Sequence, residues 1–530
     1  MTLRSMIAIL SAVTAAFGLG RSQAQVSASA PPLDSTLVWT TCGSGTPNFQ
    51  CATIKVPVDY ANPDAGTLTL AVIRHQATDL TNRIGTLFFN PGGPGGSGTS
   101  DLPVFLSQFP DTAVSRFDIV SWDPRGVGLS TALQCFPNQA AENAFFAGVP
   151  SQSFPIGTAE ETGWIKRFAA FDRICGQRQG DLLAHFSTTD TARDMDQLRQ
   201  AVGDTTLTYL GISYGTYLGA VYANLFPGKV RAMILDGVLD PVAYTAGGDQ
   251  NPELSTGQRE GSDIATGESL AAFLDQCGQA GPAGCLFSTG DAAGTHAKFE
   301  RLLQRLQAAP VTYKGFVFTP ALLLTTATNG LFFTRPVPQL TTGWVGLAST
   351  LNNIWKLTEP GTTASQNVQP ANADNTSTPP DTEEKYVSAF QQAAIECPES
   401  PNPRPAGVYR KLAQLTIARS GLIGLLTPWA DELCADWPAV AADNYTGPWN
   451  NSTASTILVI GNTHDPSTPY ARAVALSREL ANSRLLTVEG YGHTVLLNAS
   501  ACASQYEGEY LIDGALPPTG TVCAETAPPF

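Results

Sequence analysis

The chain has 530 residues, 43% of them hydrophobic, and a formal net charge of −15. This length is too great for one compact core and favours a large domain with an insertion, or two domains. A polyanion repels phosphate backbones and anionic lipid, which argues against nucleic acid and membrane surfaces as partners.

Residues 1–24 have the pattern of a secretory signal peptide. Arg4 supplies the positive charge, residues 6–19 are apolar, and small residues at 22 and 24 suit signal peptidase. The apolar stretch of 14 residues is shorter than the roughly 20 that span a bilayer. No other run of membrane length follows, and the C-terminus lacks the hydrophobic tail of a lipid-anchor signal. We therefore expect a secreted, extracellular protein without a membrane anchor; the alternative is a frayed N-terminal helix.

Ten cysteines and five N-x-S/T sequons fit the same compartment. No CxxC pair is present and histidines number only five, so no metal site is expected. Proximity along the chain suggests five disulfides, Cys42–Cys51, Cys135–Cys175, Cys277–Cys285, Cys397–Cys434 and Cys502–Cys523, the alternative being several free, buried cysteines. Possible glycan sites are Asn375, Asn444, Asn450, Asn451 and Asn498.

Short apolar strands alternate with helices in the first part of the chain and again near its end. Helices are expected between several strands, for example at 191–202, at 215–226 and near 470–482. This alternation predicts an α/β protein with a mainly parallel sheet and helices on both faces. The expected strands are 67–74, 86–90, 117–123, 207–212, 230–236, 456–461 and 485–488.

The alternation stops after residue 240, where the sequence becomes helix-rich and irregular. Residues 296–308 and 383–396 have helical patterns. Residues 358–381 are rich in Thr, Pro, Asn and Ser and are expected to form an exposed, flexible loop. We therefore predict an α/β core interrupted by a helical cap, in the order core 35–240, cap 241–449 and core 450–530.

The pentapeptide Gly211-Ile212-Ser213-Tyr214-Gly215 matches G-x-S-x-G and lies between a predicted strand and a predicted helix. A sharp strand-to-helix turn forces the serine into strained dihedral angles and lifts its hydroxyl out of the sheet. The following helix N-terminus stabilises developing negative charge. This context predicts Ser213 as a nucleophile.

A glycine-rich loop, residues 90–96, follows the strand 86–90. A tetrahedral intermediate needs two preorganised backbone N–H donors. We expect one from Tyr214, directly after the nucleophile, and the other from Gly93 in this loop. The alternative is a nucleotide-binding loop, which is disfavoured because no Lys-Ser/Thr pair follows the glycines.

A nucleophilic serine needs a base and an acid that orients the base. His493 follows the last core strand and Asp465 follows the strand before it. The chain order Ser213, Asp465, His493 is the order typical of α/β-hydrolases. The competing base is His464, and the competing acid is Asp236 at the end of strand 230–236.

Together these motifs resemble the tripeptidyl aminopeptidase branch of the α/β-hydrolases, related to prolyl iminopeptidases and with a TAP-like C-terminal region. The resemblance spans residues 40 to about 525 and implies an α/β-hydrolase fold with a cap. It also implies removal of short N-terminal peptides without a cofactor. The motifs that carry it are CATIKVPVDY (51–60), NPGGPGGSG (90–98), WDPRGVG (122–128), GISYGT (211–216), DGV (236–238), DPSTP (465–469) and GYGH (490–493).

The same family carries an Ala-Ile-x-Cys-x-acid motif, which here places Glu399 in the acid position and adds Glu396. An exopeptidase must hold a cationic α-amine, and a carboxylate does this away from water. We expect at least one of the two glutamates to bind the substrate amine. The alternative is that both are ordinary solvated carboxylates.

The sequence thus predicts a secreted serine exopeptidase that releases short peptides from free N-termini through an acyl-enzyme, on a peptide or small acyl substrate. One alternative is an esterase or small-molecule hydrolase with the same machinery, because fold and triad do not select the acyl group. Another is a non-catalytic binding protein on the same fold.

Overall fold

The computed structural model describes residues 36–43, 46, 48–149, 153–338, 340–359 and 382–530, all of which belong to one unit, residues 32–530. The predicted signal peptide, the Asn375 sequon and residues 360–381 of the predicted loop lie outside the described residues. Within these ranges, no helix has both the length and the apolar character needed to cross a membrane.

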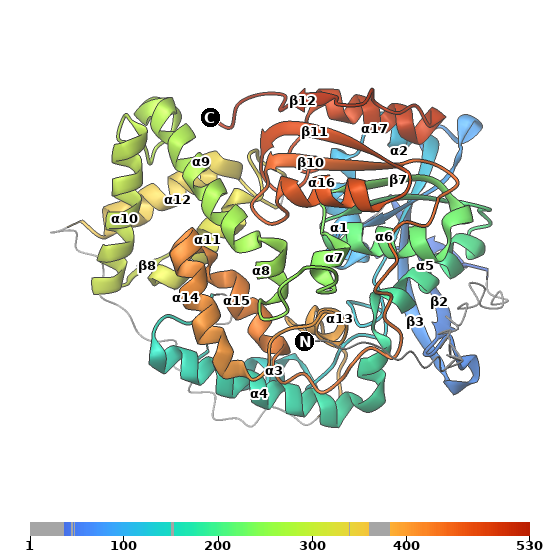
Figure 1. The fold of residues 1–530 in the computed structure, drawn as a ribbon, viewed down its shortest axis with the longest axis horizontal. Coiled ribbons are helices and arrows are strands. Elements are labelled where there is room, and N and C mark those ends of the chain that lie inside the picture. The colour runs from blue at the N-terminus through green and yellow to red at the C-terminus, as the bar shows by residue number, and fades with distance from the viewer. Residues whose placement is uncertain (1–35, 44–45, 47, 150–152, 339, 360–381) are drawn as a thin grey trace, which may run out of the picture. The chain divides into compact units, whose positions relative to one another are not determined.

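A ten-stranded sheet runs through the described residues (Figure 1). In spatial order its strands are β1 (Thr40–Thr41), β2 (Phe49–Pro57), β3 (Thr67–His75), β5 (Phe117–Trp122), β4 (Gly85–Asn90), β6 (Leu207–Ile212), β7 (Val230–Asp236), β10 (Ile457–His464), β11 (Ser483–Tyr491) and β12 (Val522–Ala524). The pairs from β1 to β5 are antiparallel, and all pairs from β5 to β12 are parallel. The carboxyl ends of the parallel strands therefore meet at one edge.

Helices cover both faces of this sheet, which explains why β4, β5 and β6 are buried along their whole length. Leu102, Ala113 and Leu511, from three helices of one face, share a core with Phe89 of β4. Leu198, Leu218 and Leu476, from helices of the other face, share a second core with Phe88. The first face carries α1 (Gly98–Phe105), α2 (Asp111–Arg116) and α17 (Ala501–Asp513), and the second carries α5 (Thr188–Ala201), α6 (Tyr214–Leu225) and α16 (Tyr470–Glu479).

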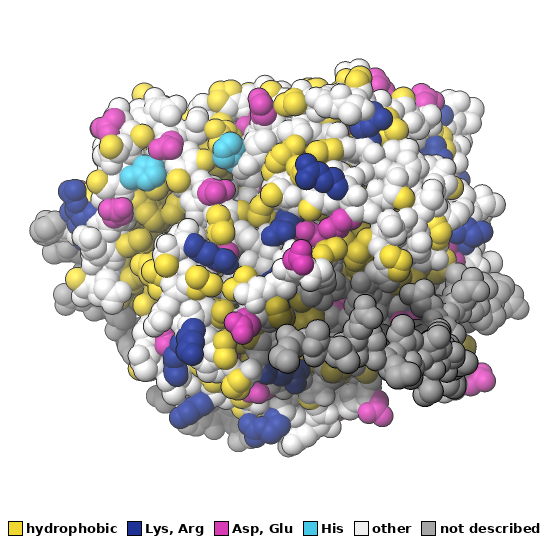
Figure 2. All heavy atoms as spheres, viewed as in Figure 1, with side chains coloured by type: hydrophobic (Ala, Val, Ile, Leu, Met, Phe, Trp, Pro, Cys, Tyr) yellow, Lys and Arg dark blue, Asp and Glu magenta, His cyan; other side chains and the backbone are white. Residues whose placement is uncertain are grey.

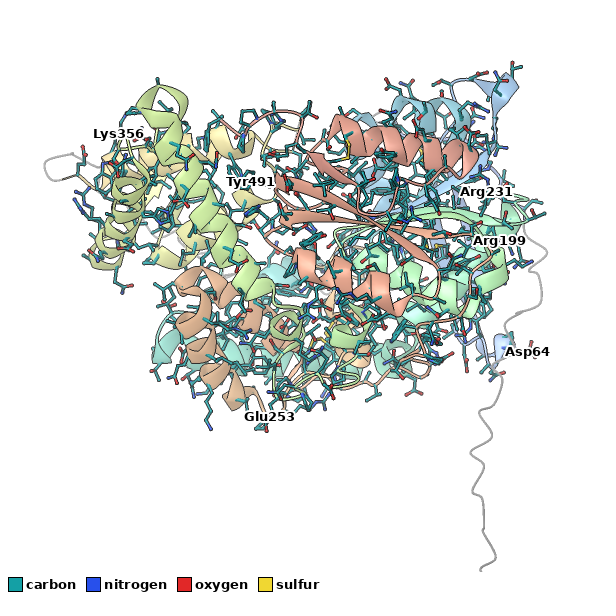
Figure 3. The ribbon with its side chains drawn as sticks, turned by 45° about the horizontal axis from the view of Figure 1, so that its top comes forward. Asp64, Arg199, Arg231, Glu253, Lys356 and Tyr491 are labelled. Carbon is teal, nitrogen blue, oxygen red and sulfur yellow. A yellow bond between two sulfur atoms is a disulfide. The ribbon has the colours of Figure 1, made fainter. Side chains whose placement is uncertain are left out.

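The segment between β7 and β10 is mostly helical and includes one small hairpin, β8–β9. Tyr491, the last residue of β11, lies at the edge of the sheet that faces these helices (Figure 3). Its ring centroid is 5.2 Å from that of Trp344, and its hydroxyl accepts a hydrogen bond from Gln276. The elements are α7 (Pro241–Tyr244), α8 (Thr256–Glu260), α9 (Ser262–Gly284), α10 (Ala292–Ala308), β8 (Val311–Tyr313), β9 (Phe316–Phe318), α11 (Pro320–Leu331), α12 (Gly343–Leu357), α13 (Ala393–Glu399), α14 (Tyr409–Ser420) and α15 (Leu426–Asp431).

Two further helices, α3 (Gln139–Phe145) and α4 (Thr158–Gln179), precede α5 in the chain. All seven predicted strands are present, with ends that differ by at most three residues. The prediction of a helix over 383–396 is wrong, because only Ala393–Glu399 is helical. The preceding residues satisfy their polar groups at long range instead: Glu384 N donates to Pro137 O, and the Tyr386 hydroxyl accepts from Phe136 N. Tertiary contacts here outweigh local helix propensity.

The ten cysteines form the five disulfides that proximity suggested, with Cα–Cα distances between 4.5 and 5.6 Å. One predicted glycan site is corrected by the structure. Asn498 is 1% exposed, and its side-chain amide donates to the backbone oxygens of Phe332, His493 and Thr494. A glycan cannot be attached to a nitrogen that is enclosed in this way.

Candidate active site

Ser213 sits in the turn between β6 and α6, with φ 56° and ψ −128°, and is half-buried. A positive φ is unusual for a residue with a Cβ and persists only where surrounding contacts enforce it. The Ser213 amide donates to Asp236 O at 3.0 Å, and its carbonyl accepts from Thr216 N and Thr216 Oγ1. These bonds hold the turn that presents the serine at the N-terminus of α6.

The glycine-rich loop after β4 packs directly on this turn. Gly92 has φ +88°, and a Cβ there would lie 2.5 Å from Ile212 O and 2.9 Å from Ser213 Cβ. Only glycine allows so close an approach. Gly93 follows Gly92 and Tyr214 follows Ser213, so the two expected N–H donors belong to segments in contact. Tyr214 is the first residue of α6, where N–H groups have no acceptor within the helix.

Asp123 fixes the far side of this loop, a role that sequence analysis did not predict. Its buried carboxylate accepts hydrogen bonds from Ser97 Oγ at 2.8 Å, from Thr99 N at 2.9 Å and from Leu129 N at 2.7 Å. One side chain thereby ties the end of the glycine loop to the loop after β5. The sequence feature that could have indicated this role is the position of Asp123 directly after a buried strand.

His493 and Asp465 lie together at the ends of β11 and β10. Nδ1 of His493 is 2.9 Å from Asp465 Oδ1 and 3.0 Å from Oδ2. The carboxylate also accepts hydrogen bonds from the amides of Ser467, Thr468 and Thr494. Burial raises the pKa of Asp465, but the His493 charge and these hydrogen bonds outweigh it, so the pKa lies below its usual value. This aspartate is built to remain negative beside the imidazole.

Two further residues fix this pair. Thr468 Oγ1 donates to Asp465 Oδ2 at 2.9 Å and lies 3.3 Å from His493 Nδ1. Phe332 O accepts from His493 N at 2.8 Å, and the two ring centroids are 4.8 Å apart, edge to face. Thr468 had a local signal, an Asp-x-x-Thr turn in which the carboxylate accepts backbone N–H groups. No local sequence pattern indicated Phe332, because it comes from the segment between β7 and β10.

The two competing residues lie elsewhere or bind other groups. His464 is exposed, and its ring lies against Tyr491 at 4.8 Å. Asp236 is fully buried and accepts hydrogen bonds from Val495 N and Leu496 N at 2.8–2.9 Å. Since Asp236 O also accepts from Ser213 N, this residue joins the serine turn to the histidine loop rather than orienting the imidazole.

Gly237 shows how closely these segments approach one another. A Cβ at this position, where φ is +68°, would lie 2.7 Å from Thr494 Cγ2 and 3.2 Å from Thr468 Oγ1. Burial raises the pKa of Asp236 to about 6, and the nearby Asp465 charge adds to the rise. The strand end at 236–237 is therefore packed against both the aspartate turn and the histidine loop.

The residues before and within α13 lie against the glycine-rich loop. Gln391 Nε2 donates to Gly95 O at 2.8 Å, and Gln391 Oε1 accepts from Gly128 N at 3.0 Å. A Cβ on Gly95 would lie 3.0 Å from Gln392 N. This contact places the Ala-Ile-x-Cys-x-acid motif next to the loop that carries Gly93.

Glu399 is 3% exposed, and both of its carboxylate oxygens are occupied. Oε1 accepts from Thr188 Oγ1 at 2.6 Å and from the Tyr244 hydroxyl at 3.0 Å, while Oε2 accepts from Thr188 N at 2.7 Å. Thr188 Oγ1 also bonds to the Tyr214 hydroxyl. Burial raises the pKa of Glu399 to about 7 despite these donors. Glu399 thus supports the side chain of Tyr214 through Thr188.

Glu396 is half-buried and its side chain is hydrogen-bonded to buried Asp431, at the end of α15. Burial, followed by the Asp431 charge, raises the pKa of Glu396 well above its usual value. Burial also raises the pKa of Asp431. The Arg259 charge opposes both shifts, yet its Nε donates to Ala243 O and its Nη1 to Leu254 O. Glu396 and Asp431 therefore form a carboxyl pair in which both pKa values are raised.

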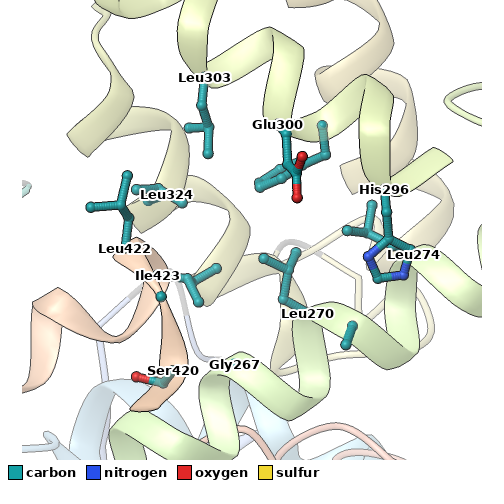
Figure 4. A pocket seen from close by; sticks show the side chains of 13 residues that line it. Gly267, Leu270, Leu274, His296, Glu300, Leu303, Leu324, Ser420, Leu422 and Ile423 are labelled. Carbon is teal, nitrogen blue, oxygen red and sulfur yellow. The ribbon is translucent and has the colours of Figure 1, made fainter. Parts of the chain in front are cut away.

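A cavity of about 330 Å³ lies among the helices between β7 and β10, away from these residues (Figure 4). Its wall includes Leu270, Leu274, Leu303 and Ile423, with His296 at one side. Figure 2 shows hydrophobic side chains on the surface over this helical part, at the left of the view. Ser213, Asp465 and His493 do not line this cavity. In the described part of the chain, no group of three or more His, Cys, Asp or Glu residues could hold a metal ion.

Two family models match the chain, the alpha/beta hydrolase fold over residues 85–254 and the TAP-like protein over residues 423–523. The serine protease Hip1 of Mycobacterium tuberculosis is 32% identical over 515 residues, covering 93% of this chain and 92% of that protein. The tripeptidyl aminopeptidase of Streptomyces lividans is 30% identical over 495 residues, covering 91% and 84%.

The carboxylesterase B of Mycobacterium tuberculosis is 33% identical over 491 residues, covering 90% of this chain and 86% of that protein. The described fold, a sheet mostly parallel and covered by helices, agrees with these matches. The chain therefore belongs to the tripeptidyl aminopeptidase-like family of α/β-hydrolases and is a serine hydrolase.

Proposed function

We propose that this chain is a secreted serine exopeptidase that releases short peptides from free N-termini through an acyl-enzyme. The observation that carries the proposal is the geometry around Ser213. A strained serine turn is tied through Asp236 to a loop whose histidine is bonded to a buried carboxylate. The peptidase names of two relatives support a peptide substrate for this site.

In this mechanism Ser213 Oγ attacks the scissile carbonyl carbon while the ring of His493 accepts the hydroxyl proton. Asp465, whose pKa is held low, stabilises the imidazolium that forms. The N–H groups of Gly93 and Tyr214 stabilise the oxyanion. His493 then donates the proton to the leaving amine, and the C–N bond breaks. Water, deprotonated by His493, hydrolyses the acyl-enzyme and restores Ser213.

The proposed exopeptidase character rests on Glu396 and Asp431. A substrate ammonium group placed beside this pair would favour its ionised form and make a charge-assisted hydrogen bond with a carboxylate. Glu396 is a half-buried residue, whereas both oxygens of Glu399 are occupied by Thr188 and Tyr244. Glu396 is therefore the amine-binding carboxylate, and Glu399 acts by holding Thr188 and Tyr214.

Secretion is supported by composition and by the disulfides. All ten cysteines are paired, which is typical of oxidising compartments, and the first 24 residues have the pattern of a signal peptide. The remaining sequons suited to glycans include Asn450 and Asn451, both exposed.

The test compares peptide substrates that differ only in a free or acetylated N-terminus. The wild type should cleave the free-amine form at least about tenfold faster in kcat/KM, because acetylation removes a charge-assisted contact. Glu396→Gln should raise KM for the free-amine form and leave the acetylated form unchanged. Glu384→Gln, an exposed glutamate before α13, is the matched control and should change neither.

An esterase is the second candidate, favoured by the similarity to carboxylesterase B. Equal cleavage of free and acetylated peptides, together with faster cleavage of simple esters, would support the esterase and overturn the exopeptidase. Labelling of the wild type but not of Ser213→Ala by a fluorophosphonate is expected under both candidates, and its failure would contradict both.

A further inference from the structure

A small apolar cavity is lined by residues that adjoin the glycine-rich loop and the carboxyl pair. Its volume is about 130 Å³. None of the side chains that line it is charged. The wall consists mainly of Phe154, Trp164, Phe168, Phe390, Trp429 and Leu433.

One wall of this cavity touches the loop that carries the expected oxyanion donor. Gln392 lines the cavity, and its backbone is the part of the chain closest to Gly95. The preceding residue, Gln391, is hydrogen-bonded to both Gly95 and Gly128. The cavity is therefore separated from the glycine-rich loop by a single backbone segment.

Residues that line the cavity also adjoin the carboxyl pair in the chain. Glu396 N donates to Gln392 O at 3.0 Å, so Gln392, which directly precedes α13, lies one helical turn before Glu396. Trp429 and Ala430, which line the cavity, directly precede Asp431. Lining residues of the cavity therefore adjoin both the contact with the glycine-rich loop and the carboxyl pair.

We propose that this cavity binds an apolar side chain of the substrate, on a residue between its free N-terminus and the scissile bond. The inference rests on the proposed exopeptidase function, because that function requires a substrate with a free N-terminus and a scissile bond near it. Its occupant is an aliphatic or aromatic side chain, because a cavity of about 150 Å³ lined by apolar side chains holds one benzene ring. Charged side chains are excluded, since no ionised group in the wall compensates for their lost hydration.

The experiment uses short free-amine peptides in which each residue before the scissile bond is varied in turn among Gly, Ala, Leu, Phe, Lys and Asp. At one position, wild-type kcat/KM should be at least about tenfold higher for Leu or Phe than for Ala, because each buried methylene contributes about 10- to 200-fold in such pockets. Lys and Asp at that position should be the poorest substrates.

Ala430 is half-buried in α15 and lines the cavity, so Ala430→Phe places an aromatic ring in it. It should remove the advantage of Leu and Phe over Ala at that position. The matched control is Ala271→Phe, which places the same side chain in the larger cavity among the helices between β7 and β10. It should leave the preference unchanged. Because Ala430→Phe could misfold, Phe390→Leu is made in parallel, and it should shift the preference towards larger aromatic side chains.

The outcomes separate the two proposals. If wild-type enzyme cleaves free and acetylated peptides equally, the exopeptidase function fails, and the cavity is then tested with esters of graded acyl chains. If the free amine is required but no position prefers apolar side chains, or if both variants keep the wild-type preference, the cavity assignment is overturned. A preference lost in Ala430→Phe and altered in Phe390→Leu, but kept in Ala271→Phe, supports it.

Discussion

Carboxyl groups in two regions of this molecule behave in opposite ways. In the histidine loop, Asp465 is 2% exposed and its pKa is lowered. Beside α13, Glu396 is hydrogen-bonded to Asp431 and both pKa values are raised. Burial acts in the same direction in both regions, so the difference comes from what surrounds each carboxyl group.

Asp465 has the His493 ring and several backbone N–H donors at its oxygens. Glu396 has another carboxyl group as a neighbour, and the nearby Arg259 donates to backbone oxygens. The first region is built to keep a negative charge permanently. In the second, the two carboxyl groups have raised pKa values, and an added cation such as the proposed substrate amine would favour their ionisation.

The largest effect should come from the serine turn. Ser213→Ala should lower kcat by roughly 10⁴-fold or more, because the residues of such a constellation act as a unit. His493→Ala should do the same, whereas His464→Ala, at an exposed position, should retain near-normal rates. Circular dichroism and thermal unfolding check that each variant folds. Loss of activity in His464→Ala but not in His493→Ala would show that the base is misassigned.

The next largest effect should come from substitution of Asp236. It tests whether the histidine loop depends on the hydrogen bonds that Asp236 accepts from Val495 N and Leu496 N. Asp236→Asn replaces an oxygen that accepts from Val495 N or Leu496 N with an amide donor. The loop should shift, and kcat should fall by about 10²-fold, the cost of a misplacement of about 1 Å. KM for free-amine peptides should stay unchanged, since the carboxyl pair is untouched. A change in KM alone would contradict a positioning role.

The strands of the core were predictable because they are continuous buried runs, as in β4 and β6. The antiparallel strand β2 was not predicted, although its buried and exposed residues alternate near its end. The helical pattern over 383–396 failed because partners far away in the chain, such as Pro137, satisfy the backbone of its first half. Local periodicity carries no information about such partners.

The candidate site likewise contains residues that could be predicted from the sequence and residues that could not. Chain order and strand ends were enough to pair His493 with Asp465, which the structure places within 2.9 Å. Asp431, Phe332 and the anchoring role of Asp236 were not predictable, because their contacts join segments remote in sequence. Of the two glutamates, the sequence could not distinguish the occupied Glu399 from the partly accessible Glu396, since that depends on Thr188 and Tyr244.

A smaller effect, in the pH dependence of KM, sharpens the contrast between the two carboxyl regions. The raised pKa values of Glu396 and Asp431 mean that the pair gains a second proton at a higher pH than ordinary carboxylates would. As pH falls, the substrate amine must displace this proton, so KM for free-amine peptides should rise by about tenfold per pH unit at most. KM for acetylated peptides or esters should not follow this rise. Asp431→Asn should flatten the profile, and an unchanged profile would argue against an amine site here.

The smallest effect concerns stability, and it tests the contrast between Asp465 and Glu399 directly. Burial raises the pKa of Glu399 to about 7 from an unfolded value near 4.5. The folded state therefore binds more protons than the unfolded state between these values, and the free energy of unfolding falls as pH rises through them. At about 1.4 kcal/mol per pKa unit, this one group contributes about 3 kcal/mol of lost stability by pH 8.

Asp465 has the opposite sign, because its lowered pKa contributes stability that is present above its unfolded pKa and lost only as pH falls further. Other buried carboxyl groups with raised pKa values, such as Asp172 at about 8, act in the same sense as Glu399. Wild type should thus be less stable at pH 8 than at pH 5.

Urea unfolding at the two pH values should show a smaller loss of unfolding free energy for Glu399→Gln than for wild type. Asp465→Asn should show the wild-type loss, because Asp465 titrates below this window. Equal losses in wild type and Glu399→Gln would mean that Glu399 is already ionised at pH 5, and that the hydrogen bonds from Thr188 and Tyr244 outweigh its burial.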